Sequence, residues 1–211
     1  MNNEIENVEL EEEKEKEKDS SLINTLLEWL DSLVISFVVV VLLFTFFLGK
    51  VKVDGASMND TLQNSDQLII SDFLYKPQRK DIVIVSRNPK NIYGDSVANQ
   101  PIVKRVIAVE GDTIEITDDG KVLLNDKELD EPYIKDYEFG KGTPNDEFEK
   151  EMKRQNLGNK LKVPKGRIFV MGDNRWNSHD SRKGDIWLID ERYVLGKVLC
   201  RVFPFDKIKT F

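Results

Sequence analysis

The sequence contains very little cysteine and histidine, with one residue of each among its 211 residues, Cys200 and His179. A single thiol excludes an internal disulfide, and Cys200 is expected to act as a small buried hydrophobic residue. No group of Cys, His and carboxylate residues has the spacing of a metal site, and no glycine-rich loop resembles a phosphate cradle. We therefore expect neither a metal nor a cofactor.

An excess of positive charge is also lacking, since 31 Lys and Arg residues face 38 Asp and Glu residues and the formal net charge is −7. Much of the imbalance lies in residues 1–31, which hold eleven acidic residues and three lysines. The rest of the chain is close to neutral. A nucleic-acid-binding protein needs a basic surface, so no nucleic-acid partner is expected.

Charge is missing altogether from residues 32–49, a run dominated by Val, Leu and Phe. As a helix rising about 1.5 Å per residue, the run reaches roughly 27 Å, close to the thickness of the hydrocarbon layer. The amphipathic residues 21–31 precede it and add length. We predict that residues 21–49 form this lead-in and a single transmembrane anchor.

Three other interpretations of the apolar run fit less well. A cleaved secretory signal begins with basic residues, whereas this chain begins with acidic ones. An interfacial helix needs a polar face, and a core helix seldom carries apolar side chains all the way round over such a length. The lysines on the two sides of the run, three before it and Lys50 and Lys52 after it, are too similar in number for the positive-inside rule to decide the orientation.

The remaining chain has the pattern of an antiparallel β domain on a membrane stalk. Residues 1–20 are a Glu- and Lys-rich tail that we expect to be disordered, and residues 50–211 form the β-rich domain. Short apolar, β-branched runs predict strands at 67–71, 81–86, 102–109, 112–117, 121–124, 167–171, 186–189 and 194–203. Asp118-Asp119-Gly120 is a typical hairpin turn. Residues 136–164 are predicted to be a polar surface excursion with a short helix around Glu147–Gln155.

Ser57 is the first candidate for chemistry, in Asp54-Gly55-Ala56-Ser57-Met58 just after the anchor. Small flanking residues let a serine present its hydroxyl on a tight turn, with backbone N–H groups nearby to hold an oxyanion. Serines in turns are common, so this segment alone is weak evidence for a nucleophile.

Lys104 is the second candidate, because alternate residues of a strand share a face and its neighbours on that face are Ile102, Val106 and Ala108. Apolar surroundings lower the pKa of a lysine. To act as a base near neutrality, the pKa of Lys104 would have to fall from about 10.4 toward 7. The alternative is a lysine at a strand edge whose amine reaches water.

The third candidate is the loop 171–182, which follows an expected strand and is dense in hydrogen-bonding side chains. It fits either a capped turn with Asp180 and Arg182 paired at the surface or a network that braces a catalytic site. A Ser57-His179-Asp180 triad is not favoured, because a third group must hold the base from another direction and His179 and Asp180 are adjacent in a short loop.

Four segments resemble those of the bacterial type I signal peptidases and occur in the same order along the chain. They are most similar to the small single-anchor form of Gram-positive bacteria. They cover residues 55–62, 79–85, 104–112 and 172–182, and Asp130-Glu131-Pro132-Tyr133 resembles the connecting hairpin of that family. The resemblance extends over roughly residues 30–205. It implies a mostly β, antiparallel catalytic domain of the signal-peptidase type on one N-terminal transmembrane helix.

The resemblance also implies roles for single residues. Ser57 would attack the scissile carbonyl and Lys104 would remove its proton. Ser178 would hydrogen-bond the lysine amine, and Asp180 with Arg182 would form a supporting salt bridge. Met58 would border a substrate groove whose small pockets favour Ala-X-Ala before the cut.

Two positions depart from the family pattern. Asp60 stands where a proline is usual, which removes a fixed φ, although an Asp side chain can also organise a turn. Gly55 stands where some relatives carry a serine that donates to the oxyanion, so stabilisation of the oxyanion would rest more on the Ser57 N–H.

The implied function is a membrane-bound serine endopeptidase that removes signal peptides from secreted preproteins, near the secretion translocon and in contact with membrane lipid. The expected location is the cell membrane, with the N-terminus cytoplasmic and the catalytic domain extracytoplasmic. Two alternatives keep the same residues. One is a self-cleaving regulatory protease that uses the Ser/Lys pair, and the other is an inactive β domain for binding on a membrane stalk.

Overall fold

The computed structural model describes residues 23–42, 45, 47–59, 61–86, 101–134 and 142–211. The chain divides into two units, residues 1–46 and 47–211. The expected disordered tail of residues 1–20 and the unusual Asp60 both lie outside the described residues.

The first unit contains one apolar helix, Ile23–Leu42. By its length of 20 residues and its composition it is able to cross a membrane. Its side chains are exposed throughout. Gly49, which we expected at the end of the anchor, already belongs to the first strand of the second unit.

The second unit is built on two antiparallel sheets, which confirms the mostly β fold class. The larger sheet has eight strands, in the order β1, β2, β11, β3, β4, β9, β10, with β12 paired to β11. Their bounds are β1 Gly49–Lys52, β2 Gln67–Ser71, β3 Ile82–Val85, β4 Ile102–Ala108, β9 Arg167–Met171, β10 Ile189–Asp190, β11 Val194–Phe203 and β12 Lys209–Thr210.

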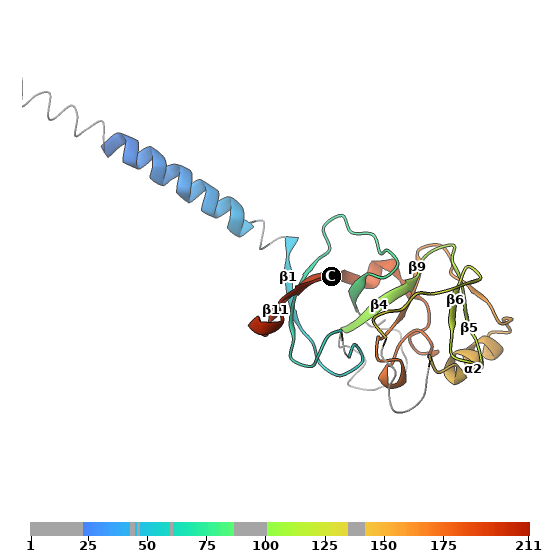
Figure 1. Ribbon diagram of the computed structural model, residues 1–211. Coiled ribbons are helices and arrows are strands. Elements are labelled where there is room, and N and C mark those ends of the chain that lie inside the picture. The colour runs from blue at the N-terminus through green and yellow to red at the C-terminus, as the bar shows by residue number, and fades with distance from the viewer. Residues whose placement is uncertain (1–22, 43–44, 46, 60, 87–100, 135–141) are drawn as a thin grey trace, which may run out of the picture. The chain divides into compact units, whose positions relative to one another are not determined.

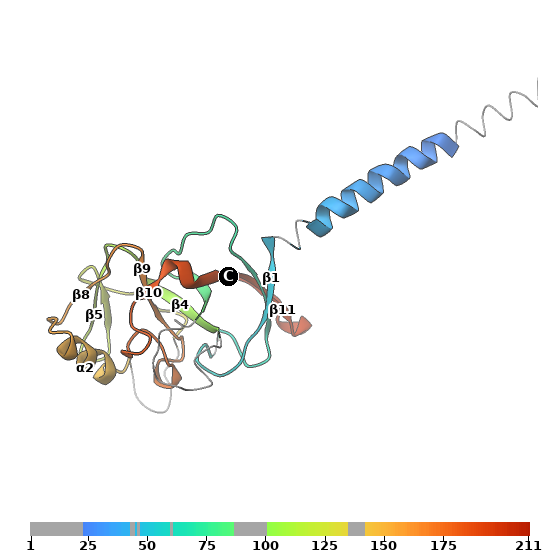
Figure 2. The same cartoon turned by 180° about the vertical axis from the view of Figure 1, so that it is seen from behind.

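The smaller sheet has four strands in the order β7, β6, β5, β8. Their bounds are β5 Thr113–Ile116, β6 Val122–Leu124, β7 Lys127–Glu128 and β8 Leu161–Lys162. Helix α2, Asp146–Arg154, lies beside this sheet, and both lie at the end of the unit opposite β1 and β11 (Figures 1 and 2). Three 3-10 turns complete the fold, η1 Arg175–Asn177, η2 Glu191–Tyr193 and η3 Phe205–Lys207.

Helix α2 connects the polar segment 136–164 to the hydrophobic core. Its outer positions are charged, with acidic residues in the first turn and basic residues in the last, as the helix dipole favours. Its inner face buries Phe148 and Met152. The Phe148 ring packs against Phe169 of β9 and against Trp187, at 5.8 and 6.0 Å between centroids. The segment therefore contributes to the core as well as to the surface.

Most of the expected strands are present within one or two residues, and three of them, β2, β9 and β11, have the expected bounds. The turn between β5 and β6 contains Gly120 with a φ of +79°, as a tight hairpin requires. The strand predicted at Ile186–Ile189 is wrong, because only Ile189 pairs with β9. Ile186 and Trp187 instead donate their N–H groups to Lys183 O, and this turn brings the indole to the core.

Phe148→Ala is expected to lower the free energy of unfolding by about 3–5 kcal/mol, because it leaves a cavity where α2 meets β9. Glu147→Ala, at an exposed position of the same helix, is expected to change it by less than about 0.5 kcal/mol. Urea unfolding of the domain measures both. Equal losses for the two variants would mean that the packing of Phe148 against β9 does not stabilise the domain.

Candidate active site

Ser57 and Lys104 lie 47 positions apart in the sequence and are brought into direct contact by the fold. The Lys104 Nζ is 2.6 Å from the Ser57 Oγ, and it also donates to the Val103 carbonyl at 3.0 Å. Lys104 is only 3% exposed. It lies on β4 beside Val83 of β3 and between Ile102 and Val106, so the expected apolar surroundings are present.

Ser57 sits on a turn that glycine makes possible. Gly55 has a φ of +99°, a conformation that other residues rarely adopt, and its N–H donates to the Asn64 side chain at 3.0 Å. The Ala56 and Met58 carbonyls accept from Asn59 and Leu62 at 3.1 and 2.8 Å. Within the described part of the chain, no acceptor pairs with the Ser57 N–H.

The loop after β9 holds this turn from the other side. The Asn174 N–H donates to Ser57 O at 3.0 Å, and its side-chain amide donates to Ala56 O at 3.2 Å. Gly172 makes the contact possible, because a Cβ there would lie 2.3 Å from both Ser57 O and Ser178 Oγ. Neither Asn174 nor Gly172 was assigned a role from the sequence, although both lie in the segment that resembles the family.

Asp180 and Arg182 form the expected salt bridge, and it is buried rather than at the surface. The Arg182 Nε and Nη2 donate to the two Asp180 carboxylate oxygens at 2.8 and 2.9 Å, and the Gly172 N–H adds a third bond at 3.0 Å. Burial alone raises the pKa of Asp180, but Arg182, Ser178 and the Gly172 N–H outweigh it, so the pKa is lowered. Asp180 is therefore a carboxylate that fixes the backbone at Gly172.

Ser178 lies between these groups, with its hydroxyl beside Asp180 and the Gly172 backbone. The Ser178 Oγ is buried, and no hydrogen-bond partner for it is found among the described residues. The expected bond to the Lys104 amine is thus not formed in this arrangement.

Two further arginine–carboxylate pairs support the same loop and were not predicted from the sequence. Arg105 donates to both carboxylate oxygens of Asp173 at 2.8 and 2.6 Å. Arg175, with its side chain 1% exposed, pairs with Glu131. In the sequence, only the positions of the two arginines pointed to these pairs, because Arg105 follows Lys104 and Arg175 lies inside the loop 171–182.

Comparison with known proteins shows the family to which the chain belongs. The model of the family "Signal peptidase, peptidase S26" matches residues 26–203, which include the apolar helix from residue 26 onward and nearly all of the β domain. The chain belongs to the signal peptidase family. Together with the apolar helix, this membership indicates a membrane-anchored peptidase.

Among the relatives is a signal peptidase I of Bacillus licheniformis, 34% identical over 206 residues, covering 91% of this chain and 96% of that protein. A signal peptidase IB of Staphylococcus aureus strain Mu50 is 32% identical over 194 residues, covering 87% of this chain and 93% of its own. A crystal structure of signal peptidase I from Enterococcus faecalis V583 is 27% identical, with a TM-score of 0.37, and covers 58% of this chain and 97% of that one.

Met58 and His179 are the remaining residues that the sequence analysis considered for the site. Met58 is 2% exposed and packs in the core with Leu62 and Leu68, so its expected role at the substrate groove stays a prediction. The His179 Nε2 lies 2.5 Å from the Asp185 carboxylate, and both side chains are half-exposed. The lone histidine therefore pairs away from Ser57, in agreement with the rejection of a histidine triad.

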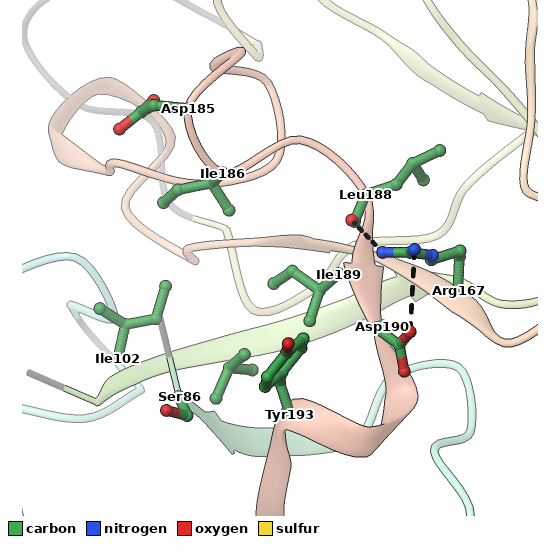
Figure 3. A pocket seen from close by; sticks show the side chains of 10 residues that line it. Ser86, Ile102, Arg167, Asp185, Ile186, Leu188, Ile189, Asp190 and Tyr193 are labelled. Carbon is green, nitrogen blue, oxygen red and sulfur yellow. Dashed lines mark hydrogen bonds and ion pairs between the residues drawn. The ribbon is translucent and has the colours of Figure 1, made fainter. Parts of the chain in front are cut away.

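A small hollow of about 40 Å³ lies beside the start of β4, with Ile102, Ile189 and Tyr193 forming its apolar wall. Arg167 spans its rim between Leu188 O and Asp190 (Figure 3). None of the candidate catalytic residues lines it. Its volume is enough for a few waters and too small for a peptide, so this hollow is not the site. Among the described residues, no group of three or more Cys, His, Asp and Glu has the arrangement of a metal site.

Gly172→Ala is expected to lower the kcat/KM for peptide cleavage about 100-fold, because the new methyl group would displace the Ser57 backbone by an ångström or more. Gly158→Ala is the matched control, since that glycine has open space around its Cα and no positive φ. The control should keep activity within about twofold. A Gly172→Ala enzyme with wild-type activity would mean that the loop does not set the position of Ser57.

Proposed function

We propose that this chain removes signal peptides from secreted preproteins, with Ser57 as nucleophile and Lys104 as general base. The observation that carries the proposal is the 2.6 Å contact between Lys104 Nζ and Ser57 Oγ in surroundings that largely exclude water. The distance fits both protonation states, because an ammonium donates to Oγ and a neutral amine accepts the proton of the hydroxyl. Burial disfavours the charged form, and only the neutral amine is a base.

The proposed reaction is acyl transfer in two steps. The Ser57 Oγ attacks the scissile carbonyl carbon while its proton moves to Lys104. The protonated amine then gives this proton to the leaving nitrogen, and an ester to Ser57 remains. In the second step Lys104 takes a proton from water, the hydroxide attacks the ester, and the proton returns to the Ser57 Oγ. The Ser57 N–H would donate to the oxyanion of both tetrahedral intermediates.

The roles of the remaining residues follow from their contacts. Asp180 and Arg182 would hold Gly172, on which the Ser57 carbonyl rests. We propose that Ser178 bonds the Lys104 amine once substrate displaces water and tightens the site, since hydrogen bonds in a substrate-free site are often incomplete. Met58 would border the substrate groove. Small pockets in that groove would accept small side chains, in keeping with cleavage after Ala-X-Ala.

The proposed partners are preproteins leaving the secretion translocon and the lipid of the cell membrane. Ser57 follows the apolar segment by only eight residues in the sequence, so an anchored nucleophile would meet cleavage sites near the bilayer at high effective concentration. Phe73 and Leu74 are strongly exposed next to Leu199 and Lys76 on one surface of the β domain. Apolar side chains with a neighbouring lysine suit an anionic membrane surface.

Ser57→Ala and Lys104→Ala are each expected to reduce cleavage of an Ala-X-Ala preprotein at least about 1,000-fold, because each removes one half of the reacting pair. Lys127→Ala, at an exposed position of β7, should cleave like the wild type. The assay uses full-length protein in detergent micelles, and mass spectrometry locates the cut. Wild-type protein that is folded but inert would favour a binding domain, and a cut only within its own chain would favour a self-cleaving regulator.

We propose that the β domain is extracytoplasmic and that the N-terminus is cytoplasmic. Protease added to intact cells, after removal of the wall, is then expected to digest the β domain and to leave an N-terminal fragment with the anchor. A tag at residue 2 should become accessible only after lysis. Protection of the β domain in intact cells would contradict this orientation.

A further inference from the structure

We infer that Glu131 and Tyr133, in the segment that follows β7, are positioning residues of the active site. The inference rests on the proposed peptidase activity and extends it to a part of the chain that contains neither reacting residue. Glu131 contacts Arg175, which holds the loop behind Ser57, and Tyr133 contacts Arg105, which directly follows Lys104.

Glu131 neutralises an arginine that is almost completely enclosed. Its carboxylate accepts from Arg175 Nη1 at 3.0 Å and also from Nη2, and the two side chains are 13% and 1% exposed. Burial alone lowers the pKa of Arg175, but the bonds and charge of Glu131 outweigh it and the pKa is raised. A buried guanidinium without a counter-ion is strongly unfavourable, so the place of Arg175 depends on Glu131.

Arg175 in turn holds the loop on which the Ser57 turn rests. Its Nε donates to Gly172 O at 3.1 Å, and its Nη1 also donates to the Thr143 hydroxyl at 2.6 Å. The Arg175 carbonyl accepts from Arg182 Nη2 at 2.8 Å, which joins it to the buried pair with Asp180. Gly172 is thereby held at its carbonyl by Arg175 and at its N–H by Asp180.

Tyr133 reaches the strand that carries the proposed base. The Arg105 guanidinium lies over the Tyr133 ring, 3.9 Å from its centroid, and Arg105 directly follows Lys104. The same arginine is paired with Asp173 of the loop. The Tyr133 hydroxyl donates to Glu131 Oε1 at 2.9 Å, so the two residues support each other.

A single short segment therefore contacts both halves of the site. Through Arg175 it fixes the loop behind Ser57, and through Arg105 it fixes the loop to the strand of Lys104. The contacts described for Glu131 and Tyr133 reach the site through Arg175 and Arg105, which makes positioning the role that they support. A positioning residue of this kind affects the turnover of bound substrate much more than substrate binding.

The test compares wild type, Glu131→Gln and Tyr133→Leu, as full-length protein in micelles, in steady-state cleavage of an Ala-X-Ala preprotein. We expect kcat to fall about 10- to 100-fold for Glu131→Gln with KM changed less than about threefold, because the reacting atoms move apart while the substrate contacts remain. Tyr133→Leu should show the same split, and Tyr133→Phe, which keeps the ring over Arg105, should recover most of the activity.

Glu151→Gln is the matched control for the loss of a buried carboxylate. Glu151 is 5% exposed and is paired with Arg154 and Gln155 on α2, outside the loop 172–182. Its kcat should stay within about twofold of wild type even if its melting temperature falls as far as that of Glu131→Gln. A kcat loss equal to that of Glu131→Gln would show a general effect of destabilisation and would overturn the inference.

A double variant, Glu131→Gln with Arg175→Gln, tests the route of the effect. If Glu131 acts through Arg175, the double variant loses little more kcat than the stronger of the two single variants. The inference would be overturned if the kcat losses of the two single variants multiply in the double variant. It would also be overturned if Glu131→Gln raises KM with unchanged kcat, or if it keeps wild-type activity. Should Glu131→Gln fail to fold, the Tyr133 variants decide by the same criteria. Inactive wild-type protein would instead refute the proposed function itself.

Discussion

The hydrogen bond between Lys104 and Ser57 joins two segments that are distant in sequence, and it forms where little water reaches. An amine in that position would serve as a base only if its surroundings disfavour the charged form, which is the general effect of apolar surroundings on a lysine. The same surroundings make any misplacement costly, because water is not present to replace a lost partner. The rest of the site therefore has to hold the two side chains together without adding flexibility.

Paired arginines meet this requirement around the loop that follows β9. A guanidinium stays charged and offers donors in a fixed plane, so a carboxylate on one side and backbone carbonyls on the other define its place. Arg105, Arg175 and Arg182 are each bound in this way, and their carboxylate partners come from the loop itself and from the segment after β7. The three pairs make the loop a rigid support for the Ser57 turn, which also needs the missing side chain of Gly172.

Much of this arrangement could be predicted from the sequence, and what was missed has physical causes. Strands β2, β9 and β11 were predicted with their bounds because each is a short apolar run rich in strand-forming residues. The expected strand at Ile186–Ile189 was wrong because Trp187 belongs to a turn whose indole fills the core beside Phe148. Strands of two residues, such as β7 and β8, are too short to carry a pattern. The pair of Ser57 and Lys104 was predicted only with the help of the family resemblance.

The sequence by itself determined the apolar segment, the β character of the domain and the residues able to do chemistry, because these follow from local composition and spacing. Only the tertiary structure decided which of them meet. It brought Lys104 to Ser57 and placed Met58 in the core. It also paired His179 with Asp185 and Glu131 with the buried Arg175. The contacts of Lys104 with Ser57 and of Glu131 with Arg175 join residues 47 and 44 positions apart. The energies of such contacts depend on burial and direction, which a linear pattern does not record.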